Sequence, residues 1–132
     1  MTIGLKRLFD YSRIIVDTTR RAAYIRVMDI TQAAQCLEKL GNPTRLEIVR
    51  LLVRAGADGL PVGDIRRHMG VPASTLSHHI LHLVTGRLIS QQRQGRVLRC
   101  RLDFGLMQAL VDMLTEECCA GVEIAEQGRE AS

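Results

Sequence analysis

Residues 73–102 decide the fold, and they read ASTLSHHILHLVTGRLISQQRQGRVLRCRL. The first part, up to Gly86, has apolar residues at helical spacing, which predicts an amphipathic helix. Its buried side is expected to consist of Leu76, Ile80, Leu81, Leu83 and Val84. The second part contains two short runs, 89–94 and 97–102, joined around Gly95-Arg96, and this pattern is typical of a β-hairpin.

Three further helices are predicted before this stretch. Residues 29–40 carry apolar side chains at helical spacing, and Gly41-Asn42-Pro43 follows them. We expect Gly41 to take the left-handed position after one helix, Asn42 to cap the next, and Pro43 to start it. That next helix reaches Gly56 and is apolar nearly all round, which favours a buried central position. A short helix over about 61–69 ends at Gly70-Val71-Pro72.

One more helix follows the hairpin, starting at about Asp103. Its predicted apolar stripe contains Met107, Leu110, Val111, Leu114 and Cys118. The order is thus four helices, a hairpin and a helix. The chain is predicted to be mainly α with a small β-hairpin, in the arrangement of a winged helix-turn-helix, with the helix-turn-helix at about 61–85.

The composition limits the class of protein. The chain has 132 residues, of which 46% are hydrophobic, so a single domain is expected rather than a disordered chain. We find neither a membrane-length apolar stretch nor a typical secretory signal, and a cytoplasmic protein is expected. Aromatic residues make up 3% with no Trp, which disfavours a surface that stacks unpaired bases.

The charge is unevenly distributed along the chain. The net charge of +4 equals that of residues 1–27 alone, whereas residues 60–101 carry +6 and residues 102–132 carry −6. A basic middle next to an acidic end favours a face that binds a polyanion. Two solvated surfaces of opposite sign are the alternative interpretation.

The predicted helix-turn-helix offers a DNA-reading face. If Leu76, Ile80 and Leu83 face the core, helical spacing turns the polar residues near the start of the helix outward. These candidate base and phosphate contacts are Ser74, Thr75, Ser77, His78 and His79. Arg93, Gln94 and Arg96 at the hairpin tip could reach the flanking backbone or the minor groove. A polar solvated helix beside a basic hairpin is the alternative.

Several of these stretches resemble the ArsR/SmtB family of transcriptional repressors. They are LGNPTRLEIVRLL (40–52), STLSHHILHL (74–83), GRLI (86–89) and RQGR (93–96), within a match over about 29–119. The resemblance implies a homodimeric repressor without enzymatic activity, joined through its first and last helices. It also implies an inverted-repeat operator in double-stranded DNA and an inducer that releases the DNA.

The same resemblance indicates where an inducer could bind. The Cys-x-Cys pair that some members carry is absent from residues 60–65. The four positions of the family's zinc site hold Asp103, Gly105, Glu116 and Cys119, so both of its histidines are missing. The ending LTEECC (114–119) resembles that of arsenic-responsive members with a vicinal cysteine pair. Cys118 and Cys119 are therefore the candidate thiols for trivalent arsenic, and no cofactor is required.

The remaining thiols and the histidines have less specific interpretations. Cys36 could complete the thiol set from the partner subunit, because its side of the helix suggests access at the interface edge. Oxidation of Cys118 or Cys119 to a disulfide or persulfide is a competing function, and simple packing is another. Cys100 is expected to pack inside the hairpin. His78 and His82 have the spacing of a helical metal pair but lie where DNA would be contacted.

The predicted domain organisation has three parts: a basic extension (1–27), a winged helix-turn-helix domain (28–119) and an acidic tail (120–132). Met28 coincides with the family boundary, so it is a candidate natural start; a basic arm that adds phosphate contacts is the alternative. A small thiol protein that binds metalloid or acts in redox chemistry without DNA is the second function considered. A winged helix that contacts only proteins is the third.

Overall fold

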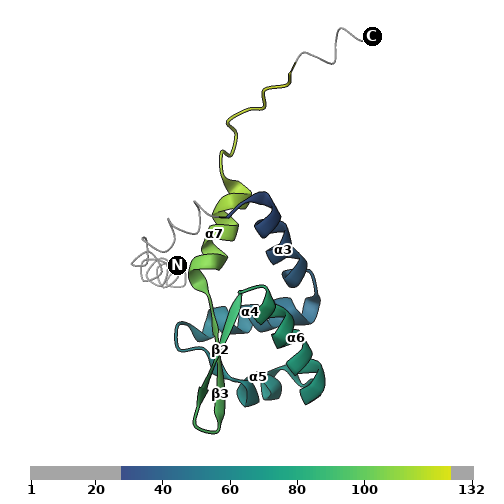
Figure 1. Cartoon of the computed structure of the whole chain (residues 1–132), viewed down its shortest axis with the longest axis vertical. Coiled ribbons are helices and arrows are strands. Elements are labelled where there is room, and N and C mark those ends of the chain that lie inside the picture. The colour runs from purple at the N-terminus through teal and green to yellow at the C-terminus, as the bar shows by residue number, and fades with distance from the viewer. Residues whose placement is uncertain (1–27, 126–132) are drawn as a thin grey trace, which may run out of the picture.

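The computed structural model describes residues 28–125 and confirms the predicted order of elements (Figure 1). The helices are α3 (Ile30–Leu40), α4 (Pro43–Ala55), α5 (Val62–Met69), α6 (Ala73–Thr85) and α7 (Phe104–Thr115). The strands are β1 (Leu60–Pro61), β2 (Ile89–Gln94) and β3 (Val97–Leu102). The predicted basic extension and the last residues of the acidic tail lie outside the described residues. No helix between residues 28 and 125 is long and apolar enough to cross a membrane.

The junction between α3 and α4 follows the sequence signals with one exception. Asn42 is the N-cap of α4, its side-chain oxygen accepts a hydrogen bond from the Arg45 backbone N–H at 3.1 Å, and Pro43 is the first helical residue. Gly41 was expected in the left-handed region, but its φ is −73°, so that prediction is wrong. A Cβ there would lie 3.2 Å from the carbonyl oxygen of Leu37, which explains why a glycine suits this tight turn.

The hairpin belongs to a three-stranded antiparallel sheet of order β1-β3-β2. Strand β1 was not predicted, because two residues are too few to show an alternating pattern. Leu60 of β1 pairs with Cys100 of β3. Gly59 precedes this pair with φ +65°, and a Cβ on it would lie 2.0 Å from the Cys100 carbonyl oxygen. Only glycine therefore allows this approach of the two backbones.

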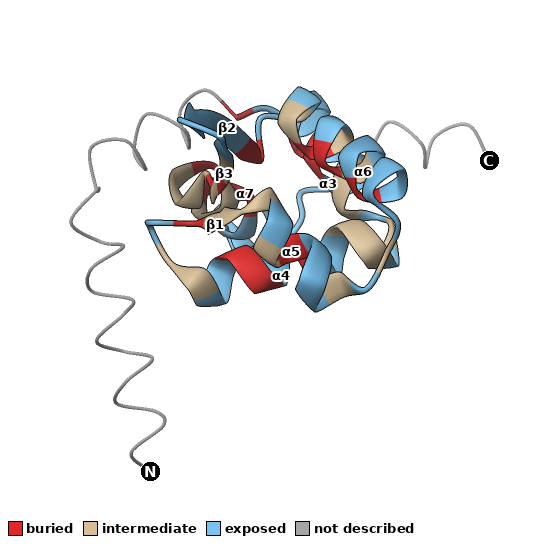
Figure 2. Cartoon of the chain, turned by 90° about the horizontal axis from the view of Figure 1, so that it is seen from below, coloured by how far each residue is buried: buried red, intermediate tan, exposed pale blue. Residues whose placement is uncertain are grey.

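One hydrophobic core joins the helices and the sheet (Figure 2). Its largest fully buried side chains are Ile48, Val49, Leu52, Ile65, Leu76, Ile80, Leu83, Leu88 and Cys100. The expectation that Cys100 packs inside is confirmed. Leu81 was expected to be buried but is 62% exposed. The core contacts Ile80 and Leu83, and Leu81 points away from it because successive helical residues are about 100° apart.

Helices α3 and α7 pack against each other and leave apolar side chains in solvent. In Figure 1 the C-terminal end of α7 lies beside the start of α3. The exposed apolar residues are Ile30 (76%) and Leu37 (41%) on α3 and Val111 (49%) and Leu114 (58%) on α7. These helices thus have an apolar face inside the protomer and further apolar residues outside it.

Helix α3 also makes a close contact with the end of α6. Gly86 is the C-cap of α6, and a Cβ on it would lie 2.8 Å from Cγ of Lys39, in the last turn of α3. The absence of a side chain at Gly86 lets the two helix ends approach each other.

Candidate nucleic-acid interface

The start of α6 presents an exposed polar surface. Ser74, Thr75, Ser77 and His78 are all exposed, as the spacing predicts. The N-cap is Pro72, which makes no side-chain capping hydrogen bond. The first backbone N–H groups of α6 are therefore left for water or an anion, and helix N-termini favour phosphate.

His79 does not share this exposure. It is half-buried, and its Nδ1 atom is buried without a hydrogen-bond partner. Burial, and then the nearby Arg45 guanidinium, lower the pKa of His79 below its usual value. His79 is thus less exposed than Ser77 and His78, which the helical spacing grouped with it.

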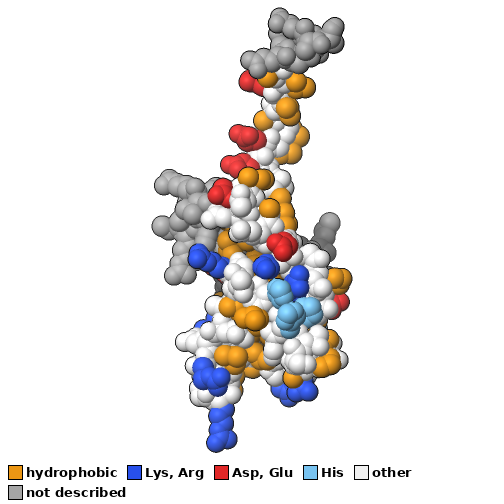
Figure 3. Space-filling model, turned by 45° about the vertical axis from the view of Figure 1, so that its right-hand side comes forward, with side chains coloured by type: hydrophobic (Ala, Val, Ile, Leu, Met, Phe, Trp, Pro, Cys, Tyr) orange, Lys and Arg blue, Asp and Glu red, His pale blue; other side chains and the backbone are white. Residues whose placement is uncertain are grey.

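The hairpin tip is exposed and basic. Arg93, Gln94 and Arg96 are all exposed, and Gly95 supplies φ +63° for the two-residue turn between β2 and β3. The side-chain oxygen of Gln94 accepts a hydrogen bond from Arg99 Nε at 3.0 Å, so this glutamine is held across the hairpin. Figure 3 shows Lys and Arg side chains at the lower end of the molecule, where Figure 1 places the tip.

The start of α6 and the hairpin tip lie at the same end of the molecule (Figure 1). The free ends of α3 and α7 lie at the opposite end. The polar helix surface and the basic tip can thus face one elongated polyanion. A major groove about 12 Å wide admits a helix such as α6.

The two neighbouring cysteines lie beyond α7. Cys118 was predicted on the apolar stripe of this helix, but α7 ends at Thr115 and residues 116–119 form turns, so that prediction is wrong. Glu117 and Cys119 have positive φ angles of 57° and 66°. Because the backbone is no longer helical, the two thiols share one side, and their Sγ atoms are 3.2 Å apart and exposed.

Cys36 is separated from this pair. Its side chain is 5% exposed, so the expectation of an accessible thiol is wrong, and burial raises its pKa. The side of α3 that carries Ala33 and Cys36 is buried in the core, whereas Ile30 is exposed. Among residues 28–125, no three His, Cys, Asp or Glu side chains are grouped to hold a metal. Within one protomer, Cys36 therefore does not join Cys118 and Cys119.

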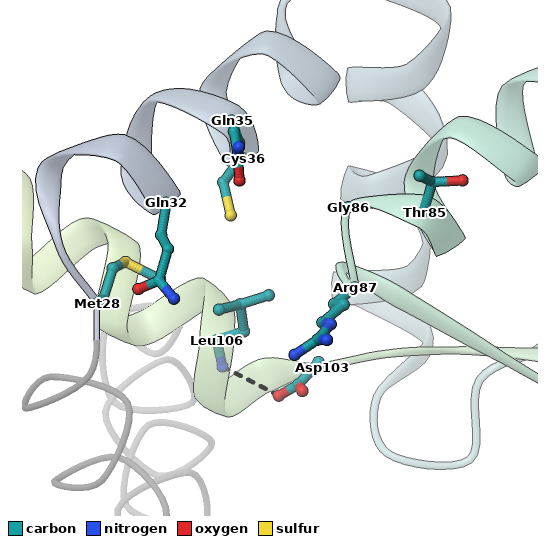
Figure 4. A pocket seen from close by; sticks show the side chains of 9 residues that line it. All are labelled: Met28, Gln32, Gln35, Cys36, Thr85, Gly86, Arg87, Asp103 and Leu106. Atoms are coloured by element: carbon teal, nitrogen blue, oxygen red, sulfur yellow. Dashed lines mark hydrogen bonds between the residues drawn. The ribbon is translucent and has the colours of Figure 1, made fainter.

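The Cys36 thiol instead faces a cavity of about 520 Å³ (Figure 4). The cavity lies between α3, the turn from α6 to β2, and the start of α7, with Gln32, Arg87 and Leu106 among its lining residues. Arg87 has a left-handed φ of 61°. No local pattern in the sequence could indicate this cavity, because its walls come from three separate segments.

Comparisons with known proteins agree with this geometry. A family model described as a helix-turn-helix domain matches residues 40–92. The chain is 34% identical over 61 residues to the putative arsenical resistance operon repressor ArsR2 of Halobacterium salinarum, covering 46% of this chain and half of that protein.

Two solved structures extend the similarity over most of the domain. One is a possible transcriptional regulator for arsenical resistance, with 30% identity, a TM-score of 0.51, and coverage of 74% of this chain and 92% of the other. The second is a homodimeric winged helix-turn-helix DNA-binding domain from Mycobacterium bovis, a possible ArsR-family regulator. It shows 25% identity, a TM-score of 0.53, and coverage of 73% and 90% of the two chains.

Proposed function

Because the chain belongs to the ArsR/SmtB family of winged helix-turn-helix DNA-binding transcriptional repressors, which are not enzymes, we propose that it binds an inverted-repeat operator as a homodimer. One observation carries this proposal: the uncapped, polar start of α6 lies at the same end of the molecule as the basic hairpin tip. This function implies a cytoplasmic location, where thiols stay reduced.

We assign the DNA contacts and the dimer contacts to exposed residues of different elements. Ser74, Thr75, Ser77 and His78 contact base edges and phosphates of the major groove, with His79 supporting them from the half-buried side. Arg93, Gln94 and Arg96 contact the flanking DNA. Dimerisation uses the exposed apolar residues of α3 and α7, and it brings two α6 helices to the two half-sites.

The proposed sensor is the Cys118/Cys119 pair, with trivalent arsenic as the inducer. The Sγ atoms lie 3.2 Å apart in solvent, so one thiophilic atom can bind both. A disulfide between them is strained, because consecutive Cα atoms are about 3.8 Å apart and disulfides span about 4.4–6.8 Å. A ligand bound by both thiols is therefore favoured over an internal disulfide. A persulfide or a disulfide between subunits is the second candidate signal.

Cys36 is the weaker sensor candidate. Its thiol is buried, and its raised pKa lowers the fraction of the reactive thiolate. The alternative function, a small thiol protein that acts without DNA, is disfavoured because members of the family bind DNA.

Fluorescence anisotropy of the reduced protein on its upstream DNA tests the proposal. We expect binding at physiological salt, at least about 10³-fold tighter than to random duplex. Arsenite should then release the labelled DNA. Failure to bind DNA preferentially would contradict the operator proposal.

Three variants separate the candidate thiols. Cys118→Ser and Cys119→Ser should keep DNA affinity and lose release by arsenite, whereas Cys36→Ala should respond like the parent protein. Loss of the response only in Cys36→Ala would move the sensor to the cavity beside α3. Release by oxidant but not by arsenite would favour the redox signal.

A further inference from the structure

Two imidazoles on α6, those of His78 and His82, are in direct contact one helical turn apart. Their Nε2 atoms are 3.2 Å apart, and the rings meet edge to face with centroids 4.6 Å apart. In Figure 3 the histidine side chains gather on one face of the molecule, next to Lys and Arg side chains. The α6 backbone brings the two side chains together, since residues four apart lie on the same helix side.

The distance between the two nitrogens suits a shared metal ion. Bonds from Zn²⁺ to imidazole nitrogen are about 2.0–2.1 Å long, so two nitrogens on one ion are about 2.8–3.4 Å apart for angles between 90° and tetrahedral. The observed 3.2 Å lies within this range. Histidines four residues apart on a helix are a known arrangement for binding one metal ion.

The surroundings decide which ion would bind. Arg45 of α4, Lys39 of α3 and His79 of α6 lie near His82. Burial is the main cause that lowers the pKa of His82, and His78, Arg45, Lys39 and His79 lower it further. Arg45 and Lys39 also repel a metal ion. An ion with a strong preference for imidazole is therefore required, and such ions include Ni²⁺, Cu²⁺ and Zn²⁺.

We propose that His78 and His82 chelate one divalent transition-metal ion of this class on the exposed face of α6. Across the described part of the chain no third His, Cys, Asp or Glu completes the group, so water fills the other coordination positions. His78 lies on the same helix side as Ser74, one turn further on. The hydrated ion therefore occupies the space that the major groove would take, and metal and DNA exclude each other. This last step rests on the proposed function.

Isothermal titration with Ni²⁺ tests the site without DNA. The parent for this test carries Cys118→Ser and Cys119→Ser, because exposed thiols would bind the ion. We expect one Ni²⁺ per chain, and His78→Gln or His82→Gln should weaken binding at least tenfold. His68→Gln, on α5, is the matched control and should bind Ni²⁺ like the parent, and thermal melting verifies that each variant folds.

Equal Ni²⁺ affinity in the parent and in both α6 variants would overturn the metal site. For the second step, saturating Ni²⁺ should weaken DNA binding at least tenfold in the parent and leave it unchanged in His82→Gln. The same loss in both proteins would overturn the exclusion of DNA. A protein that binds Ni²⁺ as expected but binds no DNA at all would contradict only the proposed function.

Discussion

Gly59 shows how strongly one residue can constrain this small fold. An alanine Cβ would lie 2.0 Å from a backbone carbonyl oxygen of β3, and the left-handed φ adds strain. We expect Gly59→Ala to lower the free energy of unfolding by about 2–4 kcal/mol. Gly63→Ala is the control, because Gly63 lies in α5 with no atom within 4 Å of the added Cβ, and it should stabilise by about 0.5–1 kcal/mol. Urea denaturation measures both, and equal effects would contradict the argument.

The histidines predict how stability depends on pH. The pKa values of His79 and His82 are lowered in the folded protein, mainly by burial, from a usual value of 6.5. Below that pH the unfolded chain binds more protons, so the free energy of unfolding should fall as the pH drops. Urea denaturation from pH 7.5 to 5 measures this, and the double variant His79→Gln, His82→Gln should show a weaker dependence. A stability that rises on acidification over this interval would contradict it.

The buried thiols predict a second change of stability with pH, at alkaline pH. Burial raises the pKa of Cys36 and Cys100 above the usual 9.0. The unfolded chain then loses its thiol protons first, so stability should also decrease as the pH rises beyond about 9.

At the scale of elements, the hairpin is expected to supply salt-dependent affinity. Arg93 and Arg96 extend from its exposed tip, and each phosphate contact contributes about 0.9 to the slope of log affinity against log salt. Arg96→Ala in both subunits of a dimer should thus reduce this slope by about 2 and weaken binding to all sequences alike. Anisotropy at several salt concentrations measures the slope. Arg54→Ala on α4 is the control and should leave the slope unchanged. An equal reduction of the slope in both variants would contradict a specific contact between the hairpin tip and DNA.

Most elements could be predicted because their signals are local. Asn42-Pro43 marks the start of α4, and Gly95 fixes the turn that places β2 and β3 in register. Strand β1 has no local pattern, since its two residues become a strand only through pairing with β3. The end of α7 was missed because Glu116 and Glu117 are good helix formers, and no Gly or Pro marks the stop at Thr115.

The exposed polar residues of α6 were predictable, but the buried side of α3 was not. Helical spacing identified the exposed Ser74, Thr75, Ser77 and His78. Periodicity does not say which of two apolar sides the protomer buries. The core takes Cys36 and leaves Leu81 outside, contrary to expectation. Which side is buried depends on packing partners that are distant in sequence.

For the whole molecule, the exposed apolar residues of α3 and α7 predict the oligomeric state. Burying them against a second copy removes apolar surface from water, which is worth about 25 cal/mol per Å². Leu114→Glu, at a position 58% exposed, should convert the dimer into monomers and weaken operator binding. Sedimentation velocity measures the mass. Leu81→Glu, at a position 62% exposed on α6, is the matched control and should remain a dimer. A dimer in both variants would place the interface elsewhere.

The close approach at Gly86 has a mechanical consequence. A Cβ on this residue would lie 2.8 Å from Cγ of Lys39, so the glycine leaves room for the Lys39 side chain at the junction of α3 and α6. Because α3 and α6 also pack against each other, a tilt of α3 is expected to displace α6. In a dimer joined through α3, the distance between the two α6 helices then depends on the subunit interface. A ligand that shifts that interface slightly would change the distance between the two α6 helices. That distance would then no longer match the helical repeat of the operator.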